Sequence, residues 1–157
     1  MTKKDLFTCA SEAWDAGNLK EAFNLFHEAA KNGDSSAQLN LGIFFYGGLY
    51  VKKDIKKALY WYKKAARDGS NGAIMNIAMY YESINNIKRA KFWLMKVVDK
   101  SDGDAALQLA KIYLLRKGRS NTNKARHYLN LVSKAKEVSE YGIEEAEKLL
   151  DSLKDSK

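Results

Sequence analysis

A short apolar pattern returns four times along this chain. Each copy is centred on an alanine, at Ala22, Ala58, Ala90 and Ala125, and these anchors are 36, 32 and 35 residues apart. Apolar or aromatic residues stand three, four and seven positions after each anchor, which is the spacing of one face of a helix. Self-similarity at a period of about 20 to 50 residues is typical of stacked repeats. The period therefore constrains the fold more strongly than any single motif.

A second helical segment precedes three of these anchors. The segments AQLNLGIFF (37–45), AIMNIAMYY (73–81) and AALQLAKIY (105–113) superpose without gaps, so each unit is interpreted as a helix pair. Because one pair cannot bury its own apolar face, the pairs are expected to stack. One register position holds small residues, which would let the paired helices approach closely: Ala10, Gly42, Ala78 and Ala110.

The sequence thus predicts an all-α fold, a right-handed α-solenoid of four stacked helix-turn-helix repeats with a C-terminal capping helix. Proline is absent, so nothing of that kind interrupts the helices. We expect one domain over residues 1–157, with repeats at about 5–33, 34–69, 70–101 and 102–136 and the capping helix at about 139–154. The predicted apolar stripe of that last helix comprises Ile143, Ala146, Leu149, Leu150 and Leu153.

The stretch LGIFFYGGLYVKKDIKKALYWYKKAARDGS resembles the Sel-one-like repeat (SLR), a relative of the tetratricopeptide repeat. The sequence departs from the family pattern at Tyr50, where the family has its second loop glycine. The resemblance is specific in the second unit, weaker in the others, and covers about residues 5–136. It implies a non-enzymatic scaffold that binds other proteins, often in bacterial signalling, secretion or toxin antagonism. The pattern is matched in order by Ala37, Leu41, Gly42, Phe45, Gly48, Val51, Asp54, Lys57, Ala58, Trp61, Tyr62, Lys64, Ala65, Ala66 and Gly69.

Charge is distributed unevenly along the chain, whose formal net charge is +8. Residues 105–136 contain eight Lys or Arg and no acid, whereas residues 137–157 contain seven acids and three lysines. A positive field of this kind attracts phosphate non-specifically, and a solvated lysine-rich face is the alternative interpretation. Nucleic acid is the less favoured partner, because no base-reading module is present. The candidate basic patch comprises Lys88, Arg89, Arg116, Lys117, Arg119 and Lys124.

The residue types that carry catalysis are sparse. His27 and His127 fall on second helices of distant units, and Cys9 occupies an inward apolar position, which favours a buried thiol over a nucleophile. Gly47 and Gly48 are explained by the repeat's turn. We therefore expect no enzymatic activity, no metal and no cofactor. No apolar run reaches the length of a membrane span and no secretory signal is found, so a cytoplasmic protein is expected.

The first helices of the repeats would line the concave side if the geometry of tetratricopeptide stacks applies. Large exposed apolar patches usually mark an interaction surface, and methionines suit an adaptable one. The alternative is self-burial, either in a tightly wound solenoid or beneath the last helix, and both interpretations stay open. The candidate concave residues are Phe7, Trp14, Leu39, Ile43, Tyr46, Met75, Met79, Leu107, Lys111 and Leu114.

These observations predict a protein-binding solenoid with one cognate partner. The basic surface favours an acidic partner, because complementary fields raise association rates and specificity. The sharpest form is a bacterial immunity protein that neutralises a toxin, which is motivated by the small size, the absence of catalytic motifs and, by analogy only, the family resemblance. The alternatives are an adaptor or scaffold in signalling or secretion that binds an amphipathic helix, and, less favoured, a basic protein associated with nucleic acid.

Overall fold

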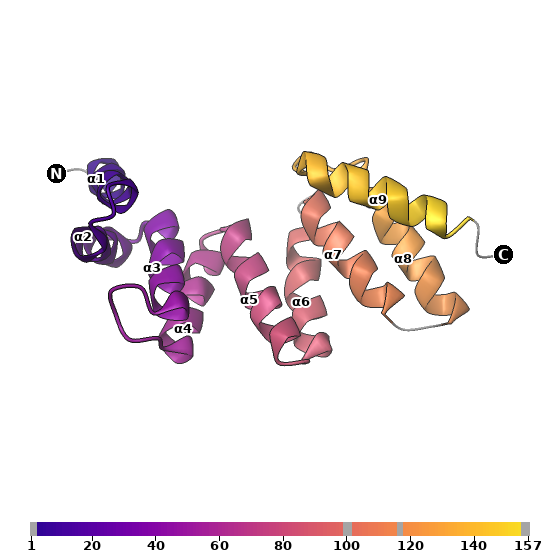
Figure 1. The fold of residues 1–157 in the computed structure, drawn as a ribbon, viewed down its shortest axis with the longest axis horizontal. Coiled ribbons are helices and arrows are strands. Elements are labelled where there is room, and N and C mark those ends of the chain that lie inside the picture. Colours follow the sequence, from indigo (N-terminus) through magenta and orange to yellow (C-terminus); the bar gives the residue numbers. More distant parts are fainter. Residues whose placement is uncertain (1–2, 99–101, 116–117, 155–157) are drawn as a thin grey trace. The chain divides into compact units, whose positions relative to one another are not determined.

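The computed structural model describes residues 3–98, 102–115 and 118–154. These residues form nine α-helices and no strand, so the prediction of an all-α fold is confirmed (Figure 1). The first eight helices match the expected repeats as pairs, and the ninth is the expected last helix. Their bounds are α1 (Lys3–Asp15), α2 (Leu19–Lys31), α3 (Ser35–Gly47), α4 (Ile55–Arg67), α5 (Asn71–Ser83), α6 (Ile87–Val98), α7 (Gly103–Leu114), α8 (Arg119–Val132) and α9 (Glu140–Ser152).

The helices group into two compact units, Met1–Ile77 and Ala78–Lys157, and the division falls inside α5. In the first unit α1 packs against α2, α2 against α3, and α3 against α4. In the second unit α6 packs against α7, α7 against α8, and α9 lies against both α8 and α7 (Figure 1). Each unit has its own hydrophobic cluster.

The starts of most helices follow from side-chain caps. A polar side chain just before the helix accepts a hydrogen bond from a backbone N–H in the first turn, which would otherwise have no partner. Ser139, for example, accepts from the backbone N–H of Gly142 at 3.0 Å and so begins α9. The same role is played by Asn18, Asp34, Asp54, Ser70, Asn86 and Asp102.

The anchor positions of the repeat form the core, as the sequence predicts. Ala22, Ala58, Ala90 and Ala125 are fully buried. The register of small residues has the predicted effect in the second repeat, where a Cβ at Gly42 would overlap the ring of Tyr62. Burial of that ring, with a smaller contribution from Tyr46, raises the pKa of Tyr62 to about 12. Most of the aromatic content near Trp61 is therefore structural.

The loop between α3 and α4 keeps a left-handed residue where the family has its glycine. Tyr50 has φ 58°, a conformation that costs an L-residue with a Cβ more than it costs glycine. Its ring lies 5.7 Å from the ring of Phe23 on α2, centroid to centroid, and it is half exposed. The loop thus retains the backbone conformation of a glycine while carrying a tyrosine.

The last helix uses a slightly different stripe from the predicted one. Ala146 is 4% exposed, and Leu149, Leu150 and Leu153 pack against the core of the second unit, but Ile143 is 38% exposed. Gly142 is buried instead of Ile143. A Cβ at this position would come too close to the side chains of Asp104, Ser139 and Val138. The first turn of α9 therefore approaches α7 through backbone rather than through a large side chain, which corrects the prediction for Ile143.

Candidate protein-binding surface

Two of the six candidate concave residues of the first unit pack against its core. The ring of Phe7 lies 5.7 Å from that of Phe26, and the ring of Trp14 meets that of Phe44 edge-on at 4.9 Å. Both side chains are partly buried against the first hydrophobic cluster. Self-burial thus accounts for these two residues.

The remaining candidates on α3 are more open. Leu39 and Ile43 are half-buried, whereas Tyr46 is 38% exposed and has the ammonium group of Lys53 5.5 Å from its ring centroid. On α5, Met75 is half-buried. Met79 is 58% exposed and is the most exposed of the ten candidate concave residues.

In the second unit, the candidates on α7 lie against a core to which α8 and α9 also contribute. Leu107 is only 4% exposed, so it offers no surface to a partner, and its assignment to a binding face is corrected. Leu114 packs against the same core. The ammonium group of Lys111 forms an ion pair with Glu145 at 3.2 Å and a hydrogen bond to the Tyr141 hydroxyl at 3.5 Å. Self-burial thus accounts for Leu107, and a contact with the last helix accounts for Lys111.

The environment of Lys111 favours its charged form. Burial alone would lower the pKa of this lysine, but the hydrogen bonds and charges of Glu145 and Tyr141 outweigh it and raise the pKa. The lysine therefore serves to hold α9 in place.

A partly buried polar pair joins α5 and α7 within the second unit. The amide of Gln108 donates a 2.7 Å hydrogen bond to Glu82 Oε2, and Glu82 Oε1 is buried without a hydrogen-bond partner. Burial raises the pKa of Glu82, opposed by the hydrogen bond from Gln108.

The second helices expose apolar side chains that sequence reasoning did not single out. On α6, Phe92 is 56% exposed and Met95 is 47% exposed. Both lie off the buried stripe of Ala90, Leu94 and Val97, and that helical spacing is the signal that could have found them. The ammonium group of Lys96 lies 4.9 Å from the Phe92 ring centroid, so apolar and basic groups are mixed on this face.

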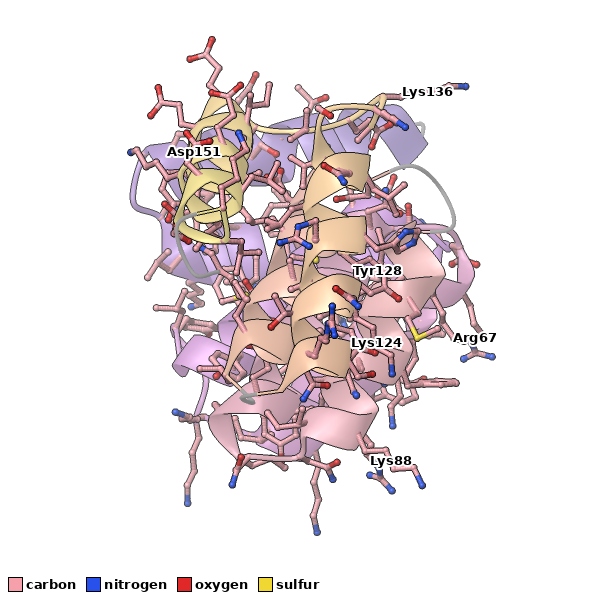
Figure 2. The ribbon with its side chains drawn as sticks, turned by 90° about the vertical axis from the view of Figure 1, so that its right-hand side faces the viewer. Arg67, Lys88, Lys124, Tyr128, Lys136 and Asp151 are labelled. Carbon is pink, nitrogen blue, oxygen red and sulfur yellow. The ribbon has the colours of Figure 1, made fainter. Side chains whose placement is uncertain are left out.

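The described members of the predicted basic patch are solvent-facing. Lys88 and Arg89 on α6 and Arg119 and Lys124 on α8 are exposed, and Figure 2 shows Lys88 and Lys124 directed outward from their helices. The side chain of Arg89 also donates a hydrogen bond to the Tyr81 hydroxyl at 3.3 Å. The other two members of the predicted patch, Arg116 and Lys117, lie outside the described residues.

Neither α6 nor α8 contains an aspartate or glutamate. Within the described part of the chain, ion pairs are formed by lysines at 57, 111 and 154, and none involves a basic residue of α6 or α8. The acids of α9 that form described ion pairs do so with Lys111 and Lys154, so the positive charge of α6 and α8 is not compensated by an ion pair.

Signs of a chemical centre are weak. Across residues 3–98, 102–115 and 118–154, no group of three or more His, Cys, Asp or Glu side chains could hold a metal ion. Cys9 is partly exposed on α1 rather than buried, which corrects that expectation. His27 stacks on Phe23, with ring centroids 5.9 Å apart, and burial followed by the charge of Lys31 lowers its pKa. No described helix is long and apolar enough to cross a bilayer.

Comparison with known families decides the class of the repeat. The family model for the Sel1 repeat matches residues 16–34, 35–70 and 103–134, more than half of the chain. This chain belongs to the Sel1 repeat family. Sel1 repeat proteins are typically protein-binding solenoids and generally non-enzymatic.

Solved structures show the same fold for this Sel1 repeat protein. It is similar to a Sel1 repeat protein from Oxalobacter formigenes, with TM-score 0.72 and 24% identity over 85% of this chain and 58% of that one. It is also similar to a protective antigen of uropathogenic Escherichia coli with an SLR fold, with TM-score 0.75 and 24% identity over 84% of this chain and 30% of that one. The Sel1 repeat chain thus spans well under two thirds of either relative. No curated protein matches it.

Proposed function

We propose that this Sel1 repeat protein captures one acidic protein partner in the cytoplasm, without catalysing a reaction. The observation that carries the proposal is the uncompensated basic surface of α6 and α8. These helices contain no acid, and Lys88, Arg119 and Lys124 on them are exposed.

The exposed apolar groups on α6 support a protein as the partner. Phe92 and Met95 stand beside Lys88 and Lys96 at helical spacing, a mixture of apolar anchor and charged rim that resembles protein interfaces. Complementary charge would speed association with an acidic protein.

Two biological forms of this binder are proposed. In the first, the protein is a bacterial immunity protein, and its partner is a toxin that it neutralises. In the second, it is an adaptor in signalling or secretion, and the exposed Met79 favours that form because methionine suits the docking of an amphipathic helix.

The test is affinity capture from a nuclease-treated lysate of the native host, eluted by a salt gradient and identified by mass spectrometry. The bait is compared with a Lys88→Glu/Lys124→Glu variant and with a control, Lys56→Glu/Lys63→Glu, which changes the net charge equally on the exposed face of α4. We expect one stoichiometric acidic protein on the wild type and on the control, and its loss from the first variant.

Capture of nuclease-sensitive material alone would contradict the proposal and favour nucleic acid. The identity of a captured protein separates the two forms. The immunity form predicts that co-expression protects cells from the captured toxin, and the adaptor form predicts that Met79→Glu abolishes capture while helicity is retained.

A further inference from the structure

We infer that the C-terminal unit holds a specific site for an acidic peptide segment, at the point where Lys91, Tyr113 and Lys124 meet. The inference rests on the proposed function and names the site through which the partner would be held. The ammonium nitrogen of Lys91 lies 4.7 Å from the centroid of the Tyr113 ring, and that of Lys124 lies 5.5 Å from it. Helices α6, α7 and α8 each supply one of these three residues.

The ring of Tyr113 explains why two ammonium groups of like charge approach the same side chain. The negative face of an aromatic ring attracts ammonium groups, and here it draws one from each of two helices. Tyr128 lies behind it in a nearly parallel stack, with ring centroids 5.7 Å apart and an interplanar angle of 6°. Figure 2 shows Tyr128 and Lys124 on the same side of α8.

Neither ammonium group is held in an ion pair, and Lys124 is exposed whereas Lys91 is half-buried. Among the described residues, neither Lys91 nor Lys124 has a carboxylate within ion-pair distance. A negatively charged group bound beside the Tyr113 ring would be attracted by both charges. The site therefore favours a ligand that carries negative charge.

A hollow of about 390 Å³ adjoins Tyr113 and Lys124, whereas Lys91 approaches the same ring without lining the hollow. The hollow is open to solvent, as suits the side chains of a macromolecule rather than an enclosed small molecule. Its described lining offers hydroxyl, amide and imidazole groups and no acid: Tyr113, Ser120, Asn123, Lys124, His127 and Tyr128.

The geometry favours carboxylates over nucleic acid. Single strands are bound by bases that stack on open aromatic faces, but the ring of Tyr113 already stacks on Tyr128 and carries two ammonium groups. The described residues of the lining include no arginine, the residue most suited to phosphate. Glutamate or aspartate side chains of a peptide match separate ammonium groups, one of Lys124 in the open hollow and one of Lys91 on the same tyrosine ring.

The site is tested with the whole chain and a capped hexaglutamate peptide, titrated by NMR at low salt with tyrosine rings labelled. A hexathymidylate oligonucleotide is the competing probe. We expect the peptide to shift the Tyr113 and Tyr128 signals, and the variant Lys91→Ala/Lys124→Ala to weaken its binding about tenfold.

The matched control is Lys57→Ala/Lys64→Ala. It removes the same net charge and two ammonium groups that also lie over aromatic rings, Lys57 near Phe45 and Lys64 near Trp61, but leaves the hollow intact. Its binding should change less than about twofold. Circular dichroism confirms that both variants retain their helicity.

Three outcomes would overturn the inference: no peptide binding at low salt, equal weakening in the two double variants, or tighter binding of the oligonucleotide at the same tyrosines. Failure here is distinguishable from failure of the proposed function. A captured protein partner that binds Lys91→Ala/Lys124→Ala at full strength refutes this site alone. Peptide binding at the site with no captured protein contradicts the proposed function alone.

Discussion

At the scale of single residues, two positions hold conformations or charges that cost stability. Tyr50 occupies the left-handed region at φ 58°, as does Asn85 at φ 56°, but asparagine tolerates this region better than tyrosine does. Glu82 keeps a carboxylate oxygen buried without a hydrogen-bond partner. Each therefore predicts a substitution that stabilises the fold.

Replacing Tyr50 by glycine should raise the free energy of unfolding by about 0.5 to 1 kcal/mol, because relief of the backbone strain exceeds the loss of the contact with Phe23 and the entropy of glycine. Urea denaturation measures the change. Asn85→Gly is the control and should change stability less. A lower stability of Tyr50→Gly would show that the ring contact outweighs the strain.

Replacing Glu82 by glutamine should stabilise the protein more at neutral than at acidic pH. The folded pKa of this carboxyl is raised above 4.5, so its favourable contribution is present below that value and is lost as the pH rises through the folded pKa. Glutamine cannot lose a proton and can still accept the hydrogen bond from Gln108. Melting curves at about pH 4 and about pH 7.5 measure the difference, and a gain that is the same at both would refute this account.

At the scale of elements, the repeat made the helix pairs and their buried anchors predictable. Ala58 and Leu94 stand at positions where every repeat has an apolar residue, and both are buried as this recurrence predicts. The position of α9 against α7 was not predictable from the sequence, because it depends on the close approach of Gly142 to Asp104. The predictions for Leu107 and Ile143 were wrong for this reason. Lys91 and Lys124 both approach the ring of Tyr113, and the three residues come from three different helices. A pattern within one helix cannot show such an arrangement.

The attachment of α9 depends on Ser139, whose hydroxyl caps the helix and donates a 2.6 Å hydrogen bond to Asp104 on α7. Ser139→Ala should lower the free energy of unfolding by about 1 kcal/mol. Hydrogen exchange should show the lost protection concentrated in α7 to α9, because repeats stabilise chiefly their neighbours. Ser36→Ala, which removes an exposed hydroxyl from α3, where Asp34 supplies the cap, should have little effect.

At the scale of the whole molecule, charge rather than chemistry distinguishes the surfaces. The chain carries +8 in total, yet its last helix is acidic and its two basic helices in the second unit contain no acid. Surface fields of this kind act over roughly a Debye length, about 8 Å at physiological salt. Their effect should therefore appear in association rates more than in folding.

Association with the captured partner should slow at least about tenfold between 20 and 500 mM salt, because screening removes the long-range attraction. Stopped-flow mixing measures the association rate, and circular dichroism at both salt concentrations checks that the helices persist. A rate that does not depend on salt would show that the basic surface plays no part in finding the partner.

The outward face of α9 has a consequence for self-assembly. Its carboxylates at Glu140, Glu144, Glu147 and Asp151 are all exposed and follow one another at helical spacing. Repeat stacks carry an inherent hazard, because an open end can accept the next molecule and polymerise. Two molecules that met face to face at α9 would bring rows of like charge together, so electrostatic repulsion opposes self-association through this face.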